Sequence, residues 1–262
     1  MPFTVSHVAA VLPGYRLFSR AHVFTAAVIG SMVPDFGLLV PGPLMRWQTH
    51  SMAALISFCL PMGLMAYWVT LLLIRPAALE VVPDRIYMRL RAGQVPSVLQ
   101  PRAWLYAAAA IVLGAITHLV WDAFTHEDAR GVRMFPMLSD FEPEMAGHPV
   151  QLYRLLQYGS SVAGLIVLAG ALLLWVHHAP APAAAPPRRL GCWQRQAWLA
   201  AYVVPTLLVM AWEFLRYQLA SGVSFSLGAV LHPVLIHGMQ CMAASLLLVS
   251  AAIRARVAVA VE

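Results

Sequence analysis

Residues 103–127, AWLYAAAAIVLGAITHLVWDAFTHE, decide the fold class of this chain. The part from 103 to 123 is an apolar run long enough to cross a bilayer, which takes roughly 20 residues in a helix. Three side chains that metal ions favour, His118, Asp122 and His126, follow at four-residue intervals at its end. A segment suited to lipid therefore ends in a polar stripe along one helix face.

The composition of the whole chain is typical of a membrane protein. Of its 262 residues, 61% are hydrophobic and 11% are charged, and the mean hydropathy is +0.73. A soluble domain carries about 25% charged residues, so this chain has too little polar surface to coat a globule in water. The net charge is +6, and the arginines cluster between apolar runs. That placement is typical of topology signals, and we therefore expect no nucleic-acid partner.

Five runs are long enough to cross a bilayer. A sixth run, 21–40, contains VPDFG, which puts a proline and an acid where a span should be apolar, so we expect a short or re-entrant helix there. The sequence thus predicts an all-α, polytopic transmembrane helical bundle of five to six spans. The five strong runs are 52–74, 103–123, 155–177, 197–219 and 227–250.

The connecting segments predict the orientation and the domain organisation. Segments 75–102 and 178–196 and the C-terminus carry clustered arginines, so we place them in the cytoplasm and the polar segment 124–154 outside. We expect one transmembrane domain over the whole chain. Its expected parts are a metal-site part at 1–170, a Pro/Ala-rich linker at 179–190 and accessory helices at 191–253.

Ionisable side chains inside the spans need a reason, because each costs roughly 2.5–3.5 kcal/mol on insertion scales. The predicted orientation places Asp35, His50, His118 and Asp122 toward the outer face. On a helix, His118 and Asp122 lie on one face, so they can bind one ion together or bridge two ions. Imidazole and carboxylate ligands suit zinc or a similar divalent ion. The sequence therefore predicts a metal site near the outer membrane surface.

Each of these residues also has a structural alternative. Asp35 could cap a helix after Pro34, and His7 could be an exposed N-terminal histidine. Glu213 and Arg216 lie toward the outer end of the run 197–219. Because they are three residues apart, they could form an internal ion pair. The sequence leaves these alternatives open.

Five motifs along the first 170 residues resemble those of a known family. In order they are MPFTVSHVAAVLP (1–13), AAVIGSMVPDFG (26–37), THS (49–51), ITHLVWDAFTH (116–126) and LYRLLQYGSS (152–161). This set is similar to the bacterial membrane family called domain of unknown function 4184. That family resembles inner-membrane proteins labelled metal-dependent hydrolases, which share an N-terminal His, a PD, an HS and an HxxxD. More remotely, the pattern is similar to zinc-dependent phospholipase C and P1-type nucleases, which cleave phosphoesters.

The resemblance implies a set of metal ligands and a limit on the number of ions. Asp122 would bridge two ions, as the Asp of the HxxxD pair does in the soluble enzymes. Those enzymes carry a further HxxxE motif, which this chain lacks near His148 and Gln157. We therefore expect one or two divalent ions, zinc first, instead of three. The implied ligands are His7, Asp35, His50, His118, Asp122 and His126.

These observations together predict a multi-pass protein of the bacterial cytoplasmic membrane that hydrolyses a phosphoester, with a membrane lipid as the first candidate substrate. Metal-activated water would be the nucleophile at the outer face. Besides Asp122, we expect catalytic roles for Glu213 as a proton carrier and for Arg216, or Arg46, in steadying the phosphate charge. The alternatives are an ion or small-molecule transporter and a non-catalytic scaffold with a structural metal. The sequence does not predict the oligomeric state.

Overall fold

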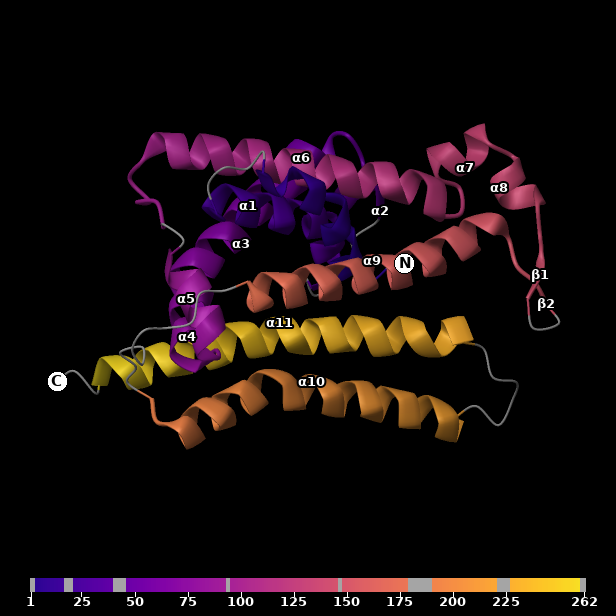
Figure 1. The fold of residues 1–262 in the computed structure, drawn as a ribbon. Helices are drawn as coiled ribbons and strands as arrows, with labels where there is room; N and C mark the ends of the chain where they lie inside the picture. The colour runs from indigo at the N-terminus through magenta and orange to yellow at the C-terminus, as the bar shows by residue number, and fades with distance from the viewer. Residues whose placement is uncertain are drawn as a thin grey trace. The chain divides into compact units, whose positions relative to one another are not determined.

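A computed structural model describes residues 3–16, 21–39, 46–92, 95–145, 148–178, 190–220 and 227–259 (Figure 1). The described residues are helical, apart from loops and one short antiparallel pair, β1 (Glu144–Met145) and β2 (His148–Pro149). Among these described residues, six helical segments are long and apolar enough to cross a membrane. The predicted all-α, multi-pass fold class is therefore confirmed. The six segments are His22–Leu39, Leu55–Val81, Pro101–Thr125, Leu152–His177, Cys192–Leu219 and Val230–Val259.

The chain forms two compact units, and each is described by itself. The first unit comprises residues 1–67 and 94–177, and the second comprises 68–93 and 178–262. The first unit contains the 3-10 helices η1 (Thr4–Ala10), η2 (Leu12–Arg16) and η3 (Val33–Leu39), the π-helix η4 (Leu55–Cys59), the helices α1 (Ala21–Met32), α2 (Arg46–Thr49), α6 (Pro101–Thr125), α7 (Arg130–Met134), α8 (Met137–Asp140) and α9 (Leu152–His177), and the strand pair. The second contains the π-helix η5 (Thr70–Ile74), α4 (Arg75–Val81), α5 (Asp84–Ala92), α10 (Cys192–Ala220) and α11 (Leu227–Val259), and α3 (Leu60–Val69) passes from one unit into the other.

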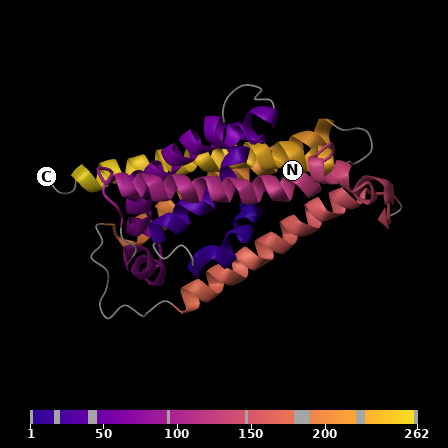
Figure 2. The same ribbon diagram turned by 90° about the horizontal axis from the view of Figure 1, so that it is seen from above.

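Small residues bring α1 and α6 into backbone contact in the first unit (Figure 2). A Cβ atom added to Gly30 would lie 2.3 Å from the backbone oxygen of Ile111, and one added to Gly114 would lie 2.3 Å from that of Ala27. Glycine is therefore required at both positions. Close approach at small residues is a common way for membrane helices to associate, because lipid offers no hydrophobic driving force between them.

The N-terminal helix η1 packs against α9. A Cβ atom on Gly164 would lie 2.9 Å from the backbone oxygen of Ser6, so these two segments also meet at a glycine. The backbone N–H of Phe3 donates to Oγ of Ser161 at 3.2 Å. Together these contacts fix η1, and with it His7, within the first unit.

The weak sixth run changes helix type where the sequence predicts an interruption. The α-helix α1 ends at Met32, and the 3-10 helix η3 continues to Leu39 with Pro34 and Asp35 in its first turn. Proline fits the start of a helical segment, because the N–H that it lacks would have no partner there. The change of helix type places the buried Asp35 directly after the α1–α6 contact.

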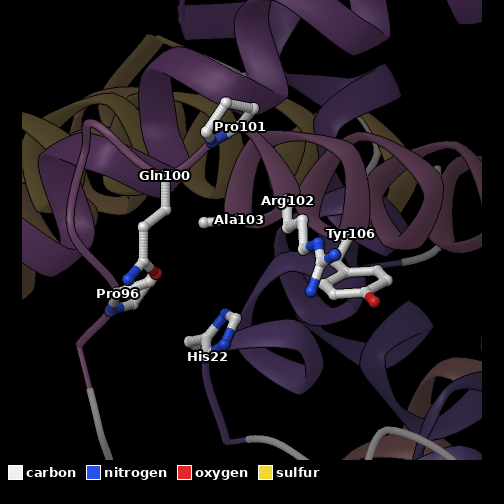
Figure 3. A pocket seen from close by; sticks show the side chains of 7 residues that line it. All are labelled: His22, Pro96, Gln100, Pro101, Arg102, Ala103 and Tyr106. Carbon is white, nitrogen blue, oxygen red and sulfur yellow. The ribbon is translucent and has the colours of Figure 1, made fainter.

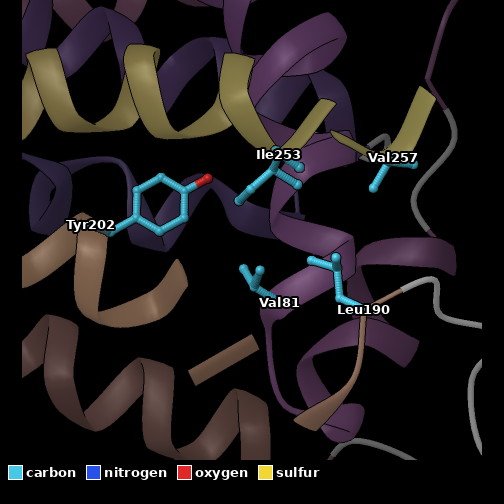
Figure 4. Close-up of a cluster of buried hydrophobic side chains, with 6 residues drawn as sticks. Val81, Leu190, Tyr202, Ile253 and Val257 are labelled. Atoms are coloured by element: carbon cyan, nitrogen blue, oxygen red, sulfur yellow. The ribbon is translucent and has the colours of Figure 1, made fainter. Parts of the chain in front are cut away.

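The second unit has its own apolar core (Figure 4). Its members lie on α4, α10 and α11, apart from Leu190, which lies two residues before α10. Tyr202 also contacts Ser250 on α11 through a hydroxyl–hydroxyl hydrogen bond of 2.9 Å. The segment 68–93 therefore packs with the helices that the sequence analysis calls accessory. The predicted linker 179–190 lies outside the described residues except for Leu190. The core residues are Ala77, Val81, Leu190, Tyr202, Ile253 and Val257.

Candidate metal centre

Six titratable side chains from five segments of the first unit meet in one cluster. The segments are η1, η3, the residue after α2, the last two turns of α6 and the residue after α6. Each of its four histidines has a ring nitrogen 3.3–3.7 Å from a carboxylate oxygen of Asp35 or Asp122. We call this group the His/Asp cluster. Its members are His7, Asp35, His50, His118, Asp122 and His126, the full set of ligands that the sequence predicts.

The HxxxD pair on α6 forms the centre of the cluster. Nε2 of His118 lies 3.6 Å from Oδ2 of Asp122 and 3.7 Å from Oδ1 of Asp35. The other ring nitrogen, Nδ1, lies 2.8 Å from the backbone oxygen of Ser31. Because a carbonyl oxygen only accepts, Nδ1 carries the proton, and the lone pair of a neutral ring is on Nε2, facing both carboxylates.

His50 is oriented in the same way by a neighbour. Its Nδ1 lies 2.7 Å from the hydroxyl oxygen of Thr49, and that hydroxyl donates in turn to the backbone oxygen of Arg46 at 3.3 Å. When the hydroxyl proton is directed at Arg46, Nδ1 of His50 donates to the hydroxyl oxygen. The lone pair is then on Nε2, which lies 3.3 Å from Asp35 and 3.5 Å from Asp122. Such outer hydrogen bonds are the usual way in which metal-binding histidines are positioned.

Two further histidines approach the other oxygen of Asp122. Nε2 of His7 lies 3.6 Å, and Nδ1 of His126 3.5 Å, from Oδ1 of Asp122. The ring of His7 also stacks on that of His118, with centroids 3.7 Å apart. Asp122 thus presents Oδ1 to one pair of histidines and Oδ2 to His118 and His50.

Burial lowers the pKa of both His7 and His126 to about 4. For His7 the next largest cause in the same direction is repulsion between its protonated form and that of His118, and for His126 it is repulsion from the charge of Arg46. Both rings are therefore neutral at pH 7, which is the state that binds a metal ion.

The residues present fit a divalent metal ion. Two ligand atoms held about 2.0–2.1 Å from one tetrahedral zinc ion lie roughly 3.4 Å apart, whereas a direct N–H···O hydrogen bond is about 2.9 Å long. The distances in the cluster match the first value. Two ligand triads have atoms within 4.8 Å of one another, His7–Asp35–His118 and His50–His118–Asp122.

Unsatisfied polar atoms point to the same conclusion. Within the part of the chain that the structure describes, both ring nitrogens of His7, Nε2 of His118 and Oδ1 of Asp122 are buried and have no hydrogen-bond partner. Buried polar groups are normally paired, and leaving one unpaired costs about 1–3 kcal/mol. A bound cation would satisfy these atoms together.

One cation of the chain itself reaches the cluster. The guanidinium of Arg46 lies 2.9 Å from Oδ2 of Asp122, while 48% of its side chain is exposed. His50, on the same segment, is 11% exposed in its side chain, so the cluster reaches the surface beside these two residues. Arg46 is one of the residues that the sequence predicts to contact a phosphate.

The sequence does not predict three contacts that position members of the His/Asp cluster. The hydroxyl of Thr4 donates to Oδ2 of Asp35 at 2.6 Å. Thr49 orients His50, and the amide of Gln157 on α9 lies 3.4 Å from Nε2 of His126. Thr49 precedes its partner in the chain, which is a local signal. The other two contacts join segments 31 residues apart and have no counterpart in sequence spacing.

Glu213 and Arg216 belong to the second unit. Their side chains pair at 2.8 Å along α10, and Nδ1 of His237 on α11 lies 3.1 Å from the other oxygen of Glu213. This geometry agrees with the alternative of an internal ion pair. The catalytic roles of Glu213 and Arg216 stay predictions.

Comparison with known proteins places the chain in a family. The family described as Domain of unknown function (DUF4184) matches residues 1–251. The chain belongs to this family. The match spans the residues of the His/Asp cluster and most of the second unit. No curated protein and no solved structure matches the chain.

Proposed function

We propose that the His/Asp cluster binds one or two divalent metal ions, zinc first, and that the protein is a membrane-bound metal-dependent hydrolase of phosphoesters. We further propose that it lies in the bacterial cytoplasmic membrane with the cluster toward the outer face, as the arginine-rich segments predict. The single observation that carries the proposal is the arrangement of His50 and His118. Each has Nδ1 tied by a hydrogen bond and Nε2 aimed at both buried carboxylates.

The chain offers ligands for two ions as well as for one. Oδ2 of Asp122 faces His50 and His118, and Oδ1 faces His7 and His126. A carboxylate that presents each oxygen to a different pair of imidazoles suits a bridging role. Two ions about 3.5–4 Å apart are common in enzymes that cleave phosphoesters.

The residues around the cluster have separable roles in this proposal. A divalent ion supplies Lewis-acid activation of a water molecule and of a phosphoryl oxygen. The carbonyl of Ser31 holds His118 in the tautomer that leaves Nε2 free to bind, Thr49 orients the ring of His50, and Thr4 holds Asp35. Arg46 contacts the cluster from the exposed side, where its guanidinium can bind a phosphate oxygen that approaches from the membrane surface.

The first test is the metal content of the purified protein. We expect bound zinc in the wild type, and its loss in His118→Ala and in Asp122→Ala. Matched controls are His148→Ala and Asp140→Ala, which remove a histidine on β2 and an exposed acid on α8. These controls should keep the metal. Unchanged metal content in both cluster variants would exclude the proposal.

The number of ligands favours a second candidate, a non-catalytic protein that keeps a structural ion. The cluster offers six side chains, five of them buried. Four protein ligands fill a closed structural zinc site, whereas a catalytic site keeps an open position. The two candidates differ in activity. Hydrolysis of phospholipids or of nitrophenyl phosphate esters that depends on the added metal would support the hydrolase, whereas retained zinc without any such activity would support the structural role.

A further inference from the structure

A pocket of about 510 Å³ lies in the first unit, at the start of α6 (Figure 3). The His/Asp cluster lies at the other end of this helix. Arg102 at the start of α6 precedes His118 by 16 residues, which is about 24 Å of helix. The walls come from the first turns of α6, the segment before α6 and the start of α1. The lining residues are His22, Pro96, Gln100, Pro101, Arg102, Ala103 and Tyr106.

The lining of this pocket is suited to an anion. It includes the guanidinium of Arg102, the imidazole of His22 and the phenol of Tyr106, and none of its seven residues is acidic. Figure 3 shows these side chains and that of Gln100 around the opening. The ring of His22 is held in place, because its Nδ1 lies 3.1 Å from the hydroxyl of the buried Tyr67.

The start of α6 adds to the positive potential. Gln100 is the residue before the helix, and its side chain makes no capping hydrogen bond. Pro101 has no backbone N–H, and the N–H of Ala103 donates to the backbone oxygen of Gln100. The helix therefore contributes mainly through the partial positive charge at this end of its dipole, which favours an anion nearby. The charged and polar side chains of the pocket surround this end of the helix.

Neighbouring aromatic residues indicate the depth of the pocket in a membrane. Trp104 and Tyr106 are 40% and 42% exposed, and Nε1 of Trp104 donates to the backbone oxygen of Val98 at 2.8 Å. Trp and Tyr concentrate where the hydrocarbon meets the headgroups. Phospholipid phosphates lie at this level, and Arg102 is placed to contact them.

We propose that this pocket binds a phosphate group, supplied by the headgroup of an anionic phospholipid, with Arg102 as its principal contact. Tyr106 and Gln100 donate further hydrogen bonds to the phosphate oxygens. The site is separate from the His/Asp cluster, and the proposal does not depend on metal binding or hydrolysis.

The test uses the full-length protein in detergent with fluorescent phosphatidylglycerol as the probe. We expect Arg102→Gln to weaken binding by about tenfold or more, because it removes a charged hydrogen-bond partner. Tyr106→Phe should weaken it less. Arg133→Gln, which removes an exposed arginine on α7, should leave binding unchanged. The melting temperature of each variant, recorded in parallel, shows that the fold is retained.

Two comparisons distinguish the sources of the phosphate. Phosphatidylcholine in place of phosphatidylglycerol should bind much more weakly, and inorganic phosphate or glycerol phosphate should displace the probe poorly. Displacement by millimolar inorganic phosphate would overturn the lipid source and support a soluble phosphate compound in the same pocket. Equal loss of binding in Arg102→Gln and Arg133→Gln, or no loss in Arg102→Gln, would overturn the site itself.

Discussion

Nδ1 of His118 donates a hydrogen bond to the backbone oxygen of Ser31 at 2.8 Å, although 87 residues separate the two in the chain. Ser31 follows Gly30 on α1, and at Gly30 and Gly114 the backbones of α1 and α6 approach too closely for a side chain to fit between them. The glycine contact therefore determines where the acceptor lies, and the acceptor determines which nitrogen of His118 faces the carboxylates. The packing of α1 against α6 therefore also sets the orientation of His118.

Gly114→Ala is expected to disturb both the packing of α1 against α6 and the orientation of His118. Its Cβ atom would lie 2.3 Å from the backbone oxygen of Ala27, so the helices must separate. We expect a loss of roughly 1–3 kcal/mol of stability, as for other overpacked sites, and reduced zinc content. Thermal unfolding and metal analysis measure the two effects. Gly159→Ala on α9 is the control, because its Cβ atom would meet nothing within 4 Å. Equal melting temperatures for the two variants would contradict the prediction.

Thr49→Val should weaken metal binding without removing a ligand. The substitution keeps the shape of the side chain but removes the oxygen that orients Nδ1 of His50. Loss of such a contact typically lowers metal affinity by roughly 10–100-fold. Competition with a zinc chelator measures the affinity. Thr117→Val removes a hydroxyl that bonds only within α6, to the backbone oxygen of Gly114, and should have little effect.

The stability of the metal-free protein should fall between pH 6.5 and pH 4. The pKa of His7 and of His126 is about 4 in the folded protein, below the ordinary value of 6.5. Over this range the unfolded chain binds more protons, so the free energy of unfolding decreases as the pH falls. Well above pH 6.5 the two rings are neutral in both states and contribute no pH dependence. Melting temperatures after chelation, recorded across this range, test the prediction. His7→Gln should show a weaker dependence than the wild type, and an identical profile would contradict the assignment.

Arg46→Gln separates substrate binding from metal binding. Arg46 contacts Asp122 from the exposed side and is not a member of either ligand triad, so zinc content should remain. If the protein hydrolyses phosphoesters, kcat/KM should fall by roughly 10²-fold, the usual effect of losing one donor to a developing charge. Arg133→Gln is the matched control. Loss of the metal in Arg46→Gln would instead show that Arg46 supports the ligands.

Sequence spacing predicts those parts of the site that depend on local geometry. The run 103–123 becomes α6 (Pro101–Thr125), and the four-residue interval puts His118 and Asp122 on one face. The interruption at VPDFG becomes the change from α1 to η3. Hydropathy and residue spacing predict such features because each depends on a single helix and on whether lipid or water surrounds it.

Other features depend on how segments pack, and spacing does not reveal them. The run 52–74 continues as helix to Val81, beyond Arg75, because the segment packs within the second unit. Thr4 and Gln157 are single polar residues in ordinary sequence contexts, and only the folded chain brings them to Asp35 and His126. The place of η1 in the cluster likewise depends on its contact with α9 at Gly164.

The acceptor for His118 is a main-chain oxygen, which every residue type possesses. Replacing Ser31 by alanine would remove its hydroxyl, which bonds to Val28 within α1, and would leave the bond to His118 in place. An alanine scan would therefore pass over the group that sets the tautomer of this histidine. Its importance would show only in substitutions that move the helix axis, and the sensitive positions would be glycines that carry no chemistry of their own.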